Sequence, residues 1–228
     1  MLHRGIMADS RTYIVPELAA PAFWHFNDVL DFIWKAPDFI EGQRELELEN
    51  HRRAEGSADG DARWRLEHGK LWSVFPGLLA NANTFLVASL LELHLQMILE
   101  GMSSGDGVPR QRGVRHTLEL LALRGAKVES ANRWPQVDAL IRFRNCLMHA
   151  AGVLERSKDG EGIEQIVATR AYVAPSHRTH ENGKDAIVRI VSQRVGKRLV
   201  VDNQYAWLAA AYSREFIVEI CGGDPLEL

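Results

Sequence analysis

Residues 134–152, WPQVDALIRFRNCLMHAAG, contain the side chains of this chain that are best suited to acid–base chemistry on a charged substrate. Histidine exchanges protons near neutral pH, and the planar guanidinium of arginine matches phosphate oxygens. At about 100° per residue, Arg144 falls on the apolar stripe of a helix and His149 lies about 140° further round. A guanidinium on a core face needs a partner or a cleft, because an unpaired buried charge costs several kcal/mol. The pattern predicts a groove with a cation on one wall and an imidazole on the other.

A second polar line runs beside this stripe, through Asp138, Arg142, Asn145 and His149 at spacings of four, three and four residues. Arg142 is therefore an alternative to Arg144 as the cation of the site. An exposed ion pair also explains Arg142, because it lies one helical turn after Asp138. Asn145 would orient His149 from the preceding turn or bind phosphate. The sequence leaves the choice between the two arginines open.

The run RNCLMH at 144–149, followed by Gly152, resembles the Arg-polar-x-x-x-His motif of the HEPN superfamily (higher eukaryotes and prokaryotes nucleotide-binding). The resemblance covers roughly residues 77–152, where a long buried helix with an acidic residue precedes the motif helix. It implies a small helical bundle and a metal-independent endoribonuclease of the toxin–antitoxin, abortive-infection or CRISPR-associated type. It also implies a homodimer, and an antitoxin or other regulatory protein that restrains the activity.

Cleavage of RNA without a metal needs a base for the 2′-OH, an acid for the 5′ leaving oxygen and a cation for the phosphorane charge. His149 and Arg144 supply both residue types, and Glu92 on the preceding long helix would hold Arg144 in place. One histidine cannot easily be base and acid at once. A twofold dimer that brings two motif helices together would supply two of each. RNA is the expected partner, and no metal or organic cofactor is expected.

Two other interpretations use the same residues. In the first, a non-catalytic HEPN-like module binds nucleotide or a partner protein through the same groove. In the second, Arg144 and Glu92 form a structural buried pair, and His149 merely ends the helix. Expression of a nuclease would be toxic, and His149→Ala would relieve the toxicity. A binding module would instead lose affinity for its partner or ligand, without any cleavage phenotype.

The overall charge limits how this chain can contact nucleic acid. Its 228 residues have a net charge of −3, which argues against a general nucleic-acid coat because such binding rests on an excess of Lys and Arg. A local basic groove is still allowed. Arg110, Arg112 and Arg115 form a small basic cluster ahead of a helix and are the candidates for contacts with the RNA backbone.

Composition also bears on the compartment. Two cysteines cannot form a disulfide scaffold, so we expect the protein in a reducing compartment, the cytoplasm. The chain does not start with a positively charged segment followed by an apolar run, so we expect no signal peptide. The longest apolar stretch, 78–99, contains Glu92, His94 and several amides. It is interpreted as a buried core helix and not as a membrane span.

Apolar spacing and the positions of Pro and Gly predict a single, mainly α domain over residues 1–228. We expect an up-and-down helical bundle of HEPN type with a β-hairpin inserted before the C-terminal helix. Residues 1–15 are expected to form a loose arm. Pro21 suits the start of a helix and Pro37 its end, because proline is tolerated only in a first turn.

The remaining segments follow from local signals. We expect, in chain order, a charged solvated helix at 38–55, a turn at 56–61, a helix that ends or kinks at Pro76-Gly77, a central helix at 78–100, a loop at 101–113 and a further helix after it. Beyond the motif helix, 163–174 and 186–201 are rich in Ile and Val with partial alternation. This pattern predicts a β-hairpin over 162–201, and a last helix follows at 203–220.

Overall fold

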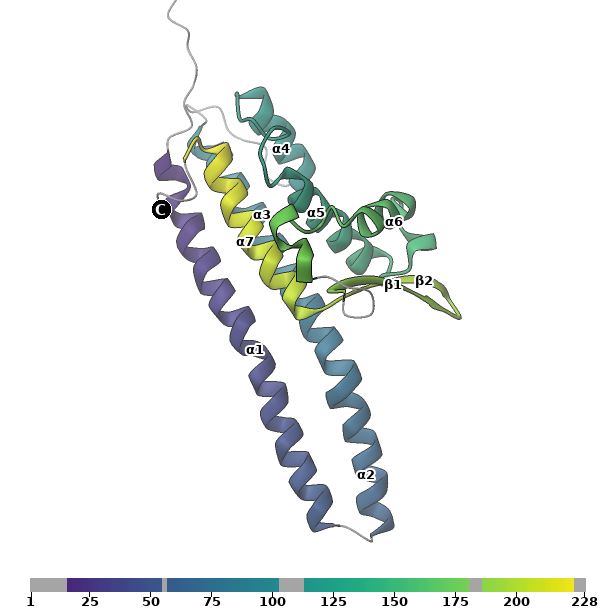
Figure 1. The fold of residues 1–228 in the computed structure, drawn as a ribbon. Helices are drawn as coiled ribbons and strands as arrows, with labels where there is room; N and C mark the ends of the chain where they lie inside the picture. The colour runs from purple at the N-terminus through teal and green to yellow at the C-terminus, as the bar shows by residue number, and fades with distance from the viewer. Residues whose placement is uncertain (1–15, 55–56, 103–112, 181–185, 224–228) are drawn as a thin grey trace, which may run out of the picture.

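The computed structural model describes residues 16–54, 57–102, 113–180 and 186–223. Within these ranges the chain is mainly helical, with one two-stranded antiparallel sheet (Figure 1). The elements are α1 (Ala20–Arg53), α2 (Ala58–Gly69), α3 (Phe75–Gly101), α4 (Val114–Leu123), α5 (Trp134–His149), α6 (Gly160–Thr169), β1 (Val188–Gln193), β2 (Gly196–Val201) and α7 (Asn203–Ile220). The arm expected at 1–15 lies outside the described residues.

Three long helices, α1, α3 and α7, pack side by side at the centre of the fold (Figure 1). His25 of α1 contacts His94 near the end of α3. Further along α1, Ile33 is hydrogen-bonded to Asn203 at the start of α7, and Asn203 is hydrogen-bonded to Asn83 near the start of α3. Helix α1 is therefore antiparallel to α3, whereas α3 and α7 run in the same direction. Helix α5, which lies between them in the chain, runs opposite to α7, because Trp134 lies beside Phe216 and Phe143 beside Tyr205.

Helix α1 continues through Pro37, where the sequence predicted a stop. A proline inside a helix leaves the carbonyl four residues earlier without its N–H partner. That carbonyl belongs to Ile33, and it accepts a hydrogen bond from Asn203 Nδ2 at 2.8 Å. Asn203 Oδ1 in turn accepts from Asn83 Nδ2 at 2.6 Å. A side chain of α7 thus replaces the missing backbone donor, which a local reading of the sequence could not anticipate.

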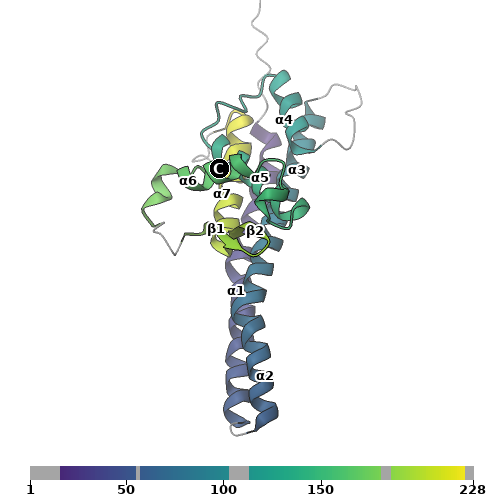
Figure 2. The same cartoon turned by 90° about the vertical axis from the view of Figure 1, so that its right-hand side faces the viewer.

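The second half of α1 and helix α2 project from the body as a two-helix arm (Figures 1 and 2). Ser57 caps α2, so residues 58–61 are helical and the predicted turn at 56–61 is wrong for them. Aromatic stacking joins the two helices, with the rings of His51 and Trp64 4.7 Å apart. A π-helical turn, Lys70–Val74, joins α2 to α3, and Pro76 lies in the first turn of α3, so the helical run does not end at Pro76.

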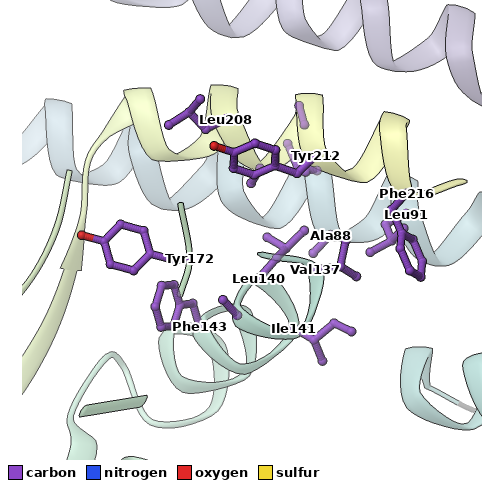
Figure 3. Close-up of a cluster of buried hydrophobic side chains, with 14 of the residues drawn as sticks. Ala88, Leu91, Val137, Leu140, Ile141, Phe143, Tyr172, Leu208, Tyr212 and Phe216 are labelled. Atoms are coloured by element: carbon purple, nitrogen blue, oxygen red, sulfur yellow. The ribbon is translucent and has the colours of Figure 1, made fainter. Parts of the chain in front are cut away.

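Helix α5 forms a second layer against α3 and α7 (Figure 3). Val137 and Leu140 are fully buried in the interface, and Phe143 lies 6.0 Å from the ring of Tyr172 and 5.4 Å from that of Tyr205. The helix begins at Trp134, and Pro135 occupies its first turn, where the missing N–H of proline costs no helical hydrogen bond. Deep burial of one face fixes the rotation of α5, and with it the direction of its polar face.

The β-hairpin before the last helix is confirmed, but it is shorter than expected. Its strands pair from Val188↔Val201 to Gln193↔Gly196. The predicted first strand at 163–174 is wrong, because residues 160–169 form helix α6. Ile163, Ile166 and Val167 recur at helical spacing and pack against the core, which outweighs the β propensity of the individual residues.

By length and composition alone, the helical run 58–101 could cross a membrane. Core helices of proteins that never enter a bilayer have the same length and composition, so these two properties are weak support for a membrane span. Asn83, Thr84 and His94 of α3 are buried inside the fold, and α1, α4, α5 and α7 pack on this helix. These contacts agree with a central core helix, as the sequence predicted.

Candidate functional site

A pocket of about 740 Å³ opens at the C-terminal end of α5. Helix α5 contributes its polar face, α4 contributes one arginine, and the segment between α5 and α6 closes the far side. The lining residues are Arg115, Arg142, Asn145, His149, Ala150, Arg156, Ser157, Lys158 and Asp159. The imidazole and the amide of the sequence motif thus share one concavity with four cationic side chains.

The turn after α5 determines where His149 stands. Gly152 has φ +79° and its N–H donates to the carbonyl of Cys146 at 3.0 Å, which closes the helix. The Gly152 carbonyl then accepts from the N–H of Leu199 in β2 at 2.8 Å. A Cβ at Gly152 would lie 3.1 Å from the carbonyl oxygen of Leu199. The hairpin therefore anchors the end of the motif helix, and His149 projects from it as an exposed side chain.

Arg142 lies inside the pocket but is held by two carboxylates. Its Nε donates to Asp138 at 2.6 Å and its Nη1 pairs with Asp159. Burial by itself would lower the pKa of Arg142, and the hydrogen bonds and charges of the two aspartates outweigh burial and raise that pKa. Asp138 also pairs with Arg115 at 2.6 Å. The ion pair with Asp138 that the sequence offered for Arg142 is present, and the second pair, with Asp159, lies within the pocket.

Arg144 does not line the pocket, although the sequence placed it at the centre of the site. It is half-buried at the edge of the core face, and its Nη1 donates to Asn145 Oδ1 at 2.9 Å. The expected ion pair with Glu92 is wrong, since no salt bridge joins the two among the described residues. Met148, four residues after Arg144, is 44% exposed. Arg144 stands on the same side of α5 as the fully buried Val137, but nearer the end of the helix, where it is only half-buried.

Two basic residues of the pocket were missed by the sequence analysis. Arg156 and Lys158 are exposed, and within the described part of the chain neither side chain pairs with a carboxylate. The signal was available, because a basic RSK run begins seven residues after His149. Arg115 of the predicted basic cluster does reach the pocket, whereas Arg110 and Arg112 lie outside the described residues.

The cysteine of the motif has a structural role. Cys146 is fully buried, and burial raises the pKa of its thiol despite a hydrogen bond with Ser157. A thiolate nucleophile is therefore disfavoured at this position. In the described ranges, no group of three or more His, Cys, Asp or Glu side chains is placed to hold a metal ion.

Comparison of the chain with protein-family models, with curated proteins and with solved structures gives no match.

Proposed function

We propose that this chain is a metal-independent endoribonuclease of HEPN type that works as a homodimer and acts as a toxin or phage-defence effector under the restraint of a partner protein. The observation that carries the proposal is the pocket, which combines a histidine, an amide and four cationic side chains in one concavity of about 740 Å³. Small-molecule sites have volumes of about 300–1,000 Å³, so a nucleotide fits this space.

The cations of the pocket have different tasks in this proposal. Arg156 and Lys158 have no carboxylate partner among the described residues, so their charge is available for the phosphates of RNA. Arg142 is kept in place by Asp138 and Asp159, and its remaining N–H groups can stabilise charge on the reacting phosphate. Arg144 is assigned a positioning role, because it fixes the amide of Asn145 at the rim of the pocket.

His149 acts on the 2′-OH. The imidazole takes its proton, the 2′ oxygen attacks the adjacent phosphorus, and the bond from phosphorus to the 5′ oxygen breaks. The products are a 2′,3′-cyclic phosphate and a 5′-OH, which needs a proton from an acid. The exposure of His149 supports a role for the same residue of a second copy as that acid.

The test is cleavage of a mixed RNA pool with EDTA present. We expect His149→Ala to lower the cleavage rate roughly 100- to 10,000-fold, which is the usual contribution of a general acid–base group. His68→Ala, on the arm and far along the chain from the pocket, is the matched control and should retain the activity. Product ends should be cyclic phosphate and 5′-OH. Intact RNA from folded wild-type protein at every concentration would refute the proposal.

Substitutions at the two arginines separate their roles. Arg142→Ala should weaken RNA binding and cleavage together, since it removes a cation from the pocket. Arg144→Ala should lower cleavage with little change in RNA binding, since its guanidinium contacts Asn145 and lies outside the pocket. Asp159→Asn removes a carboxylate from the pocket and should tighten RNA binding, with a steeper dependence on salt.

The position of Arg144 outside the pocket favours a second candidate, a module that binds nucleotide or RNA without cutting it. Such a module needs the cations and does not need His149 as a base. Filter binding with labelled RNA distinguishes the two. Retention of RNA by wild type and by His149→Ala, with no cleavage by either, would establish binding alone. Toxicity on expression that His149→Ala relieves would support the nuclease.

A further inference from the structure

The outward face of α3 exposes a row of apolar and small side chains. Leu78 is 59% exposed, Leu86 40%, Leu93 47% and Met97 42%, although α3 is the central helix of the fold. Ala82 and Ser89 are exposed between them. The six residues recur at spacings of four, four, three, four and four, so they lie within an arc of about 100° on one side of the helix, and we call them the α3 stripe. In Figure 2, α3 lies along the edge of the body, with α1 and α7 on its inner side.

The spacing of the α3 stripe is the same in both directions. Two copies of α3 placed antiparallel about a twofold axis would align Leu78 with Met97, Ala82 with Leu93 and Leu86 with Ser89. At two of these three levels a small side chain meets a large one, which is the condition for close packing of two helices. A twofold interface requires a surface that matches itself when reversed, whereas an unrelated partner imposes no such symmetry.

The charges around the stripe also point to a second copy. The stripe itself has no charged residue from position 78 to position 97. A lipid surface fits less well, because half-buried Asn81, Glu92 and Gln96 border the stripe and would enter the bilayer with it. A single carboxylate costs roughly 2.5–3.5 kcal/mol at the bilayer centre. In a protein interface these groups stay at the polar rim, in contact with water.

We infer that the α3 stripe is the surface through which two copies of this chain pair, antiparallel, with Leu86 of each copy against Ser89 of the other. The stripe extends over about 29 Å at 1.5 Å per residue, which is long enough for a continuous helix–helix contact. The inference names the face through which the copies pair and does not depend on RNA cleavage, whereas the proposed chemistry also asks that His149 of the second copy act as the acid.

The first test is the mass of the protein in solution. Light scattering should give twice 25.7 kDa for wild type and 25.7 kDa for Leu86→Glu, which places two carboxylates in the centre of the interface. Leu123→Glu is the matched control, because Leu123 is 83% exposed at the end of α4, and this variant should stay dimeric. Circular dichroism checks that each variant is folded. A wild-type monomer, or a folded Leu86→Glu dimer, would overturn the inference.

The second test measures the register and needs no destabilising variant. Chains with Leu86→Cys and chains with Ser89→Cys, co-expressed with different tags, should form a mixed disulfide under mild oxidation, because the two positions face each other. The native cysteines are buried and do not compete. Leu78→Cys with Ser89→Cys is the control, since these positions would lie about 12 Å apart along the axis. Equal crosslinking in both mixtures, or monomers that sediment with vesicles, would contradict the pairing.

Discussion

Replacing Asn203 by Ala tests how α1 crosses Pro37. The substitution removes the Nδ2 donor of the Ile33 carbonyl and the Oδ1 acceptor of Asn83. A buried polar group left without its partner costs roughly 1–3 kcal/mol. Both bonds are only partly buried, so we expect the two losses to lower the free energy of unfolding by about 2–3 kcal/mol in total. At about 2–4 °C per kcal/mol for a chain of this size, the Tm should fall by roughly 4–12 °C.

A second background isolates the bond to the Ile33 carbonyl. Pro37→Ala supplies a backbone N–H that reaches this carbonyl as in a regular helix. Asn203→Ala should therefore cost about 1 kcal/mol less in the Pro37→Ala background than in wild type. Urea denaturation followed by circular dichroism measures all four free energies, and Gln204→Ala, at an exposed position next along α7, is the control. An equal cost in both backgrounds would refute the argument.

Three further predictions concern stability. Gly152→Ala should destabilise the protein by about 1–2 kcal/mol, because φ is +79° at this position. Gly42→Ala should stabilise it by about 0.5–1 kcal/mol, because Gly42 lies inside α1 and its added Cβ would meet open space. Thermal denaturation of the two variants compares these effects. Burial, followed by the charge of a neighbouring histidine, lowers the pKa of His94 from 6.5 to about 4. Between these two pH values the unfolded chain binds a proton at this histidine and the folded chain does not, so the free energy of unfolding should fall as pH drops from 6.5 to about 4. Urea titrations at several pH values should show a weaker pH dependence for His94→Gln than for wild type. Tyr212→Phe should destabilise the protein by about 1–2 kcal/mol, because the Tyr212 hydroxyl accepts a hydrogen bond from a backbone N–H at 3.1 Å. Tyr205→Phe should be neutral or stabilising, because the buried Tyr205 hydroxyl has no hydrogen-bond partner in the described structure. Equal effects of the two substitutions would contradict this prediction.

The structure confirms those helices whose ends are marked by local chemistry. Helix α5 begins beside Pro135 and closes before Gly152, and α7 begins where Asp202 accepts a hydrogen bond from the N–H of Tyr205. Caps and breakers act within one turn of the chain, so the sequence contains the whole interaction. The same reasoning failed at Pro37, because the compensating donor comes from Asn203, far along the chain.

The candidate site was predicted in part. The sequence placed Asn145, His149 and Arg142 on one polar line, and the pocket contains all three. It could not choose between Arg142 and Arg144, because both satisfy helical spacing. The tertiary structure decides the matter: Arg142 lines the pocket, whereas Arg144 lies outside it and contacts Asn145.

The sequence by itself determined that this chain folds into a mainly helical protein with a short hairpin before its last helix. It also determined that a histidine, an amide and an arginine share one face of the motif helix. Only the tertiary structure decided that Arg156 and Lys158 join them, and that Asp159 neutralises part of the charge. The physical reason is distance: helical periodicity acts over a few residues, whereas the walls of a pocket come from segments that packing brings together.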